Sequence, residues 1–276
     1  MSAPRVLLVK AHVRGHVKKN GSVVRPYETK KPAAVSKPPV QTSLFSHMKQ
    51  PAKSVPPGGI THPRKNDDGH DVVIKSPHKP SAVDTWRDPE SVATFVPHGA
   101  VPDDLYGVPF ASWKDAPTTI EGWASVPGQI DLDEPELVAA PGKHISAGVV
   151  VEEPDGRVWM VAPTNAFGGY MATFPKGTQE DGLSLQATAL KEAWEESGLQ
   201  VEIVDFIDDV ERTTSVCRYY LARRVGGTPA DMGWESQACI LAPKDHLYEI
   251  LNRAVDHGIA EAIGAGPVPE PKGSLF

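Results

Sequence analysis

The sequence predicts an α/β protein of the α+β kind, with a mixed β-sheet sandwiched between helices and a long, largely irregular N-terminal extension. Two observations carry this prediction. In the C-terminal half, apolar β-branched runs and helical spacings follow one another in the order strands, helix, strands, helix, which is typical of a mixed sheet covered by helices. In addition, 27 prolines and 24 glycines among 276 residues indicate a large share of irregular chain.

The elements of the C-terminal half follow from their local patterns. The run at 145–152 is apolar and β-branched, Pro154-Asp155-Gly156 favours a turn, and 157–162 is typical of the returning strand. Further strands are expected at 201–207, 216–225 and 236–241, a short extended piece at 173–175, and a helix at 246–257. We therefore expect a domain at 143–263 and a flexible tail at 264–276.

The N-terminal half divides into three expected segments. Residues 1–31 predict a basic β-hairpin element around Asn20-Gly21, a dipeptide that favours a tight turn. Residues 32–80 are rich in Pro, Lys, Ser and His and predict a disordered linker. Residues 81–142 concentrate aromatic residues between prolines, so we expect this segment to wrap on the following domain as a structural brace or as one wall of a ligand pocket.

Charge is distributed unevenly along the chain. Residues 1–80 hold 15 Lys and Arg against 4 Asp and Glu, whereas the remainder holds 13 against 31. A basic arm on an acidic body suggests nucleic-acid contact by residues 1–80, or a solvated tail that keeps the chain soluble. The hairpin also resembles short basic elements of some phage-borne proteins.

Few other signals bear on the compartment or the partners. Cys217 and Cys239 show no metal or redox spacing, so we expect reduced core residues. No apolar stretch approaches the ~20 residues of a membrane helix, which predicts a cytoplasmic protein without a membrane partner. The sequence does not indicate the oligomeric state.

One predicted helix carries the candidate chemistry. Ser184 is a favourable N-cap, residues 185–197 contain no proline or glycine, and Gly198 stands where a left-handed residue ends a helix. Glu192, Glu195 and Glu196 occupy positions i, i+3 and i+4, so their side chains share one face. Such a face is either solvated surface or, since like charges repel, a place for a divalent cation such as Mg²⁺.

The residues from 177 to 199 resemble the Nudix box, Gly-x5-Glu-x7-Arg-Glu-U-x-Glu-Glu-x-Gly-U, where U is a bulky aliphatic residue. Gly177, the three helix glutamates, Gly198 and Leu199 fall in register, and Phe174-Pro175-Lys176-Gly177 is similar to the family's usual entry into the box. Two residues depart from it: Leu183 replaces the box glutamate and Lys191 the box arginine. In the family this glutamate–arginine pair braces the loop and the helix. Lysine carries only a point charge, whereas arginine presents a planar guanidinium group with several donors.

The resemblance implies the Nudix fold and a hydrolase of nucleoside diphosphates linked to another moiety. It implies Mg²⁺ or Mn²⁺ held by Glu192, Glu195 and Glu196 with a backbone carbonyl near Gly177, and a phosphate contact from Lys176. Short matches to diadenosine tetraphosphate hydrolases indicate Glu235 as a further catalytic or metal-binding carboxylate and Tyr219 as a base-stacking residue. Alternatively, Glu235 is only a loop carboxylate, and Tyr219 is only a core aromatic residue.

Two hypotheses for the whole protein remain open at this point. The first is a metal-dependent pyrophosphohydrolase acting on a nucleotide or polyphosphate, such as a dinucleoside polyphosphate. The second is a nucleotide-sensing binding module whose basic arm contacts nucleic acid or a phage or mobile-element assembly. The departures at Leu183 and Lys191 favour the second, and the retained helix glutamates favour the first. Arg212, Arg218 and Arg223 either face an anionic substrate or are solvated.

Overall fold

The computed structural model describes residues 8–12, 16–17, 23–24, 28–32 and 60–266. The chain forms two compact units, Met1–Ser54 and Val55–Phe276. In the first unit, β1 (Leu8–His12) pairs antiparallel with β4 (Glu28–Pro32), and β2 (His16–Val17) pairs with β3 (Val23–Val24). The predicted turn at Asn20-Gly21 lies outside the described residues, and so does most of the predicted tail.

The second unit is built on a mixed sheet with strand order β13-β14-β10-β11-β15-β7, and β12 pairs with the first half of β10. The central strands β10 and β14 run parallel, and the other pairs are antiparallel. The strands are β7 (Ala93–Phe95), β10 (His144–Glu152), β11 (Val158–Pro163), β12 (Lys176–Thr178), β13 (Leu199–Glu211), β14 (Ser215–Gly227) and β15 (Ser236–Ala242).

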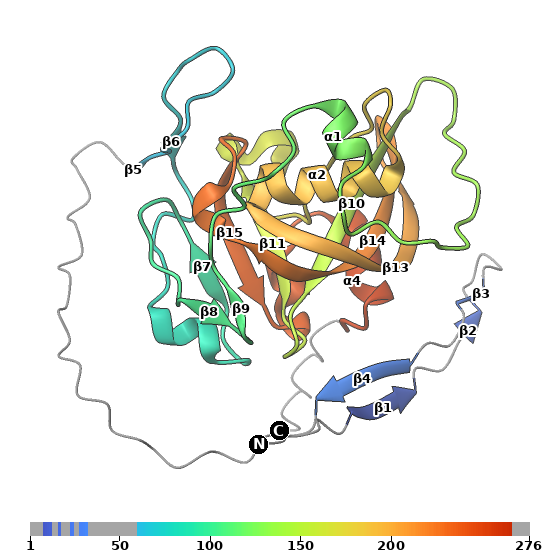
Figure 1. Ribbon diagram of the computed structural model, residues 1–276, viewed down its shortest axis with the longest axis horizontal. Coiled ribbons are helices and arrows are strands. Elements are labelled where there is room, and N and C mark those ends of the chain that lie inside the picture. Colours follow the sequence, from blue (N-terminus) through green and yellow to red (C-terminus); the bar gives the residue numbers. More distant parts are fainter. Residues whose placement is uncertain (1–7, 13–15, 18–22, 25–27, 33–59, 267–276) are drawn as a thin grey trace, which may run out of the picture. The chain divides into compact units, whose positions relative to one another are not determined.

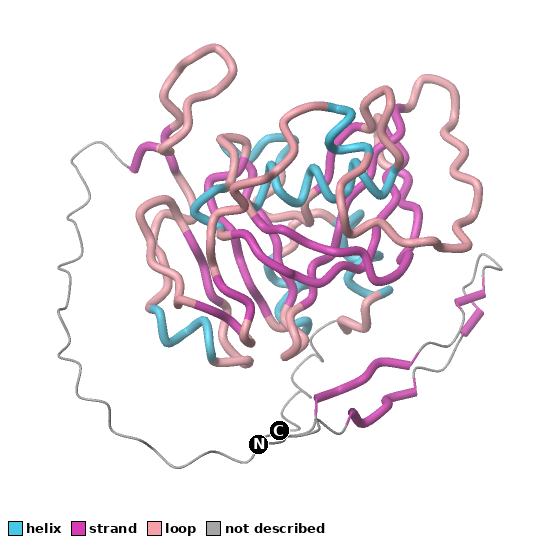
Figure 2. The backbone as a smooth tube through the Cα atoms, in the orientation of Figure 1, coloured by secondary structure: helices cyan, strands magenta, loops and turns pink. Residues whose placement is uncertain are grey.

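Helices cover the two faces of this sheet, as Figures 1 and 2 show. Helix α2 (Leu185–Ser197) packs on one face through Ala187, Leu190 and Ala193, in the same core as Trp159 of β11. Helices α3 (Leu247–Ile250) and α4 (Ala254–Ala262) pack on the other face. Because both faces are covered, β10 has six consecutive buried residues where a half-exposed strand would alternate. The predicted sandwich of a mixed sheet between helices is confirmed.

The predicted helix ends where its local signals place the ends. The hydroxyl of Ser184 accepts from the backbone N–H of Ala187 at 2.9 Å, and Gly198 takes a left-handed φ of 71°. The predicted helix at 246–257 is wrong as one piece, because it is broken at 251–253. Leu251 is extended and buried there, and the side chain of Asn252 is engaged by another loop.

Residues 60–80 correct the predicted linker. Strands β5 (Ile60–Thr61) and β6 (Val73–Ile74) pair with each other, and Ile60 and Ile74 are buried with Val96, Ala162 and Ala238. The backbone N–H of Lys75 also donates to Gln237 Oε1 at 2.9 Å. Thus two very short apolar pieces in a polar stretch suffice to attach this segment to the domain.

The aromatic segment 81–142 contributes to the main core. Trp86, Phe95, Leu105 and Trp123 are buried in the cluster that contains α2, and β7 adds an edge strand to the sheet. Its other elements are short: η1 (Val83–Arg87), β8 (Asp104–Leu105), β9 (Val108–Pro109) and α1 (Ile120–Ala124).

Two buried arginines of the sheet hold this segment through its backbone. Arg157 donates to carbonyls of the first part of the segment, and Arg224, which is paired with buried Glu153 at 2.6 Å, donates to carbonyls of the second part. The acceptors lie in or beside very short elements, which leave many of their carbonyls without partners inside the element, and these guanidinium donors bind them. The acceptors are Thr85, Trp86 and Ser91 for Arg157, and Leu105, Val108 and Pro109 for Arg224.

Candidate active site

The three helix glutamates differ in their surroundings. Glu192 and Glu196 are half-buried, whereas the side chain of Glu195 is 47% exposed. Burial raises the pKa of Glu192, and the charges of Glu196 and Glu195 raise it further. Burial also raises the pKa of Glu196, although the nearby Lys176 ammonium opposes this. The face therefore gathers negative charge in a partly desolvated place.

The entry loop meets this face through backbone atoms. The backbone N–H of Lys176 donates to Glu196 Oε2 at 2.9 Å. Gly177 lies directly against the carboxylate of Glu192, so a Cβ at this position would fall on that carboxylate. The first glycine of the box is thus required by close approach, since its φ is not in the left-handed region.

Glu235 lies in the turn before β15, next to the C-terminal end of α2. The backbone N–H of Gly233 in the same turn donates to the carbonyl of Glu195 at 2.6 Å. Burial raises the pKa of Glu235, and the charge of Glu195 raises it further. The structure therefore brings Glu235 into electrostatic range of the helix carboxylates, as the sequence comparison led us to expect.

The two departures from the box compensate each other. Leu183 is 4% exposed and packs in the main core, where an unpaired carboxylate would be costly. Lys191 instead pairs with Glu180, which lies three positions before Leu183, at 2.8 Å, and with Glu195 at 2.5 Å. Burial lowers the pKa of Lys191, but these carboxylates outweigh it and the pKa is raised. Sequence reasoning missed Glu180, although its signal was an acidic residue in the turn before the helix.

Tyr219 corrects the predicted stacking residue. It is fully buried between Phe174 and the α4 side of the sheet, and its hydroxyl accepts from Arg212 Nη2 at 2.7 Å. The reason is topological: β14 is a central strand with both faces covered, so a tyrosine on it cannot reach a base. Of the other strand arginines, Arg218 pairs with Glu134 and Asp209, and Arg223 forms a surface pair with Glu202.

The side chain of Lys176 joins a buried polar network that the sequence did not reveal. Its Nζ donates to the Thr173 hydroxyl at 3.1 Å, and that hydroxyl donates to Asp256 Oδ2 at 2.8 Å. Asp256, on α4, is fully buried and pairs with Arg212 at 2.5 Å. No local pattern could have linked these residues, because they come from three separate parts of the chain.

The chemistry of the donor set fits a hard divalent cation. Carboxylate oxygens are the ligands that Mg²⁺ prefers, and within residues 60–266 Glu192 has no hydrogen bond or ion pair of its own. Among the described residues no three acidic, histidine or cysteine side chains converge closely enough to hold a metal ion as they stand. Lys191 pairs with Glu195, whereas Glu192 and Glu196 have no lysine or arginine ion pair among residues 60–266.

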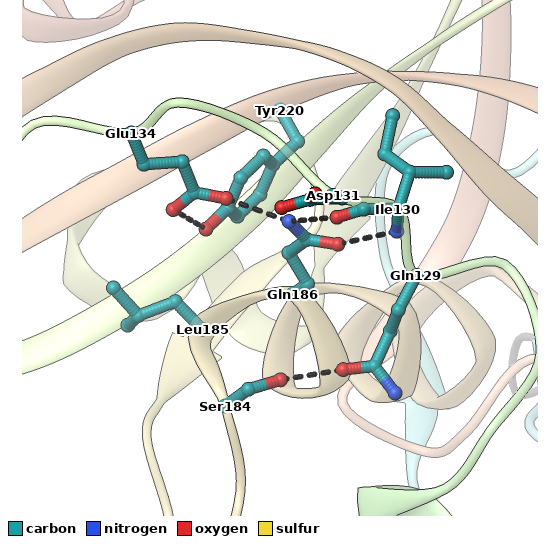
Figure 3. A pocket seen from close by; sticks show the side chains of 8 residues that line it. All are labelled: Gln129, Ile130, Asp131, Glu134, Ser184, Leu185, Gln186 and Tyr220. Atoms are coloured by element: carbon teal, nitrogen blue, oxygen red, sulfur yellow. Dashed lines mark hydrogen bonds between the residues drawn. The ribbon is translucent and has the colours of Figure 1, made fainter.

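A separate hollow of about 370 Å³ lies at the start of α2 (Figure 3). Its polar groups bind one another: Ser184 donates to Gln129, and Gln186 and Tyr220 both donate to Glu134. We interpret it as the seam between residues 129–134 and the helix.

Comparison with known proteins agrees with this geometry. A family model described as the NUDIX domain matches residues 142–259. The fold and the glutamate-bearing helix thus define a Nudix hydrolase domain, the type of domain that acts on pyrophosphate-containing substrates. Residues 142–259 of this chain match that family model and form this domain.

Solved structures give a distant likeness. A NUDIX hydrolase from Nitrosomonas europaea is 19% identical over 45% of this chain and 70% of that chain, with a TM-score of 0.37. A C. elegans Ap4A hydrolase is 18% identical over 44% of this chain and 96% of that chain, with a TM-score of 0.37. An ADP-ribose pyrophosphatase from Streptococcus suis 89-1591 is 19% identical over 42% of this chain and 88% of that chain, with a TM-score of 0.35. No curated protein matches the chain. In the described part of the chain, no helix is long and apolar enough to span a membrane.

Proposed function

We propose that this protein is a metal-dependent pyrophosphohydrolase that cleaves a nucleoside diphosphate linked to another moiety, such as a dinucleoside polyphosphate. The observation that carries the proposal is the concentration of carboxylates at the C-terminal half of α2. Glu192 and Glu196 are half-buried with raised pKa values, and Gly177 leaves room for the Glu192 carboxylate. Such an arrangement costs stability and is typical of a functional site.

Each residue has a defined task in this proposal. Glu192, Glu196 and, after release from Lys191, Glu195 would hold Mg²⁺ or Mn²⁺. When bound, the cation neutralises pyrophosphate and lowers the pKa of an attacking water. Glu235, whose pKa is raised by burial and by the charge of Glu195, would serve as a proton acceptor in this scheme. The Lys176 ammonium adds positive charge on the substrate side.

The Glu180–Lys191 pair supports the enzyme over the binding module. Loss of both box residues was the feature that favoured a module without catalysis. Because Lys191 is held by Glu180 and contacts Glu195, a brace between the loop and the helix is retained. The basic N-terminal arm stays a candidate for nucleic-acid contact on its charge alone.

Product analysis across a panel of nucleotide pyrophosphates with Mg²⁺ or Mn²⁺ tests the proposal. Glu192→Gln and Glu196→Gln should each lower kcat by about 100-fold or more, since several kcal/mol of transition-state stabilisation depend on the metal. Glu202→Gln, which alters a surface pair on β13, is the matched control and should retain activity. Full turnover in excess EDTA, or in the Glu196→Gln variant, would contradict the assignment.

A further inference from the structure

A second cavity, of about 390 Å³, lies on the α4 side of the domain and has no part in the glutamate site. Three segments border it: the loop that follows β11, the turn between β13 and β14, and the N-terminal end of α4. Its lining residues are Tyr170, Glu211, Arg212, Thr213, Asn252, Arg253, Ala254 and Val255.

Positive charge surrounds the ring of Tyr170 in this cavity. Lys176 Nζ lies 5.0 Å from the ring centroid, Arg253 lies 5.3 Å from it and Arg212 5.8 Å. Arg253 is exposed, and its side chain has no hydrogen-bond or ion-pair partner among residues 60–266. This clustering of three cations is unfavourable unless an anion offsets it.

The acidic groups nearby are already matched. Glu211 is bound by Lys143 at 2.8 Å, and Asp256 is the partner of Arg212. The first pair contributes no net charge, Asp256 offsets Arg212, and Glu196 lies in electrostatic range of Lys176, so Arg253 is the cation that remains unmatched. The cavity therefore keeps a positive excess.

Two elements that border the cavity carry hydrogen-bond donors without acceptors among the described residues. The side chain of Arg212 is 9% exposed, and its Nε is buried without any acceptor among the described residues. Helix α4 begins at the cavity, and its N-cap residue, Arg253, provides no side-chain cap for the first backbone N–H groups. Donors without acceptors indicate a ligand that only accepts hydrogen bonds, as a phosphate does.

The wall of the cavity is fixed and not a loose loop. Asn252 donates to the carbonyl of Gly169 at 2.8 Å and accepts from the backbone N–H of Met171 at 2.8 Å. The Tyr170 hydroxyl accepts from Arg212 Nη1 at 2.7 Å. The break between α3 and α4 is what frees Asn252 to make these bonds.

We propose that this cavity binds an anionic group of the substrate, a phosphate that lies beyond the scissile pyrophosphate. The inference rests on the proposed function, and Lys176 provides the link. The backbone of Lys176 contacts Glu196 of the catalytic face, while its ammonium lies over the Tyr170 ring of the cavity. A substrate with a chain of phosphates spans both places, with Arg253 and Arg212 receiving its distal end.

Binding of inorganic triphosphate to the full chain in EDTA, measured by calorimetry at low and fixed ionic strength, tests this inference. Without metal the glutamate face repels the probe, so binding reports on basic residues. Arg253→Gln should weaken binding about tenfold or more, because a charge-assisted hydrogen bond is lost. Arg223→Gln removes an equal charge from the outer surface of β14 and should leave the affinity unchanged.

The outcomes separate this proposal from the proposed function. Equal affinity of the wild type and Arg253→Gln, or no binding in EDTA, overturns the anion site even if the enzyme hydrolyses pyrophosphates. Binding that depends on Arg253 supports the anion site even if no pyrophosphate is cleaved in Mg²⁺. The absence of cleavage would contradict only the proposed hydrolysis.

Discussion

Gly177→Ala should abolish most activity while leaving the fold intact. A Cβ added at this position would lie less than 3.0 Å from the Glu192 carboxylate, and real Cβ atoms essentially never show so short a contact. The obstacle is the end of a flexible side chain, so the carboxylate moves away at small cost. A displacement of about 1 Å at a reacting centre lowers the rate on the order of 100-fold. We therefore expect kcat/KM to fall by about this factor, with the free energy of unfolding within about 1 kcal/mol of wild type.

Steady-state kinetics with saturating Mg²⁺, together with urea unfolding, measures both quantities. Gly258→Ala is the matched control, since Gly258 lies in α4 with no atom near its Cβ position, and this change should leave kcat/KM unaltered. A double-mutant cycle identifies the cause. In a Glu192→Gln background, Gly177→Ala should have little further effect. Activity of Gly177→Ala within threefold of wild type, or full additivity with Glu192→Gln, would refute the reasoning.

Three further results are expected. Glu180→Gln should weaken Mg²⁺ binding about tenfold, because Lys191 then holds Glu195 alone, while Lys191→Arg should retain binding; calorimetry measures both. The metal-free protein should lose stability as pH rises from about 5 towards 8, since folded Glu192 and Glu196 hold protons above their ordinary pKa of 4.5 and this contribution disappears once they ionise. Urea unfolding in EDTA measures this pH dependence. If the free energy of unfolding falls with pH as steeply in the Glu192→Gln/Glu196→Gln variant as in the wild type, the expectation is contradicted. Mg²⁺ binding should release protons near neutral pH, which calorimetry in buffers of different ionisation enthalpy detects.

The glutamate-bearing helix could be predicted from the sequence because its signals are local. Ser184 and Gly198 each act within one turn, and the structure places both helix ends as expected. Strand β10 was also evident, because a continuous apolar run marks a strand buried on both faces. Strand β13 alternates apolar and polar residues in its first half, and this alternation marked only its first part.

What the sequence could not provide depends on contacts between distant segments. Strand β7 has three residues and exists because β15 offers an edge. The break at Asn252 contains no proline or glycine and follows from the bonds of that side chain to the loop at 169–171. Tyr219 was misassigned because a short match to a family strand does not reveal that both faces of that strand are covered here. Asp256 and Arg212 meet only in three dimensions.

The buried arginines have a consequence for where the folding unit begins. The family match starts at residue 142, yet Arg157 and Arg224 each donate to three carbonyls that precede this boundary. A chain cut at 142 would remove these six carbonyls, leave Arg157 with Asp155 and Arg224 with Glu153, and expose the apolar surface that the upstream segment covers. It would also remove β7, so that β15 would keep only β11 as a neighbour, and it would uncover Trp159. Such a fragment should be recovered as aggregate, and any catalytic comparison with shorter relatives requires the upstream segment to remain attached.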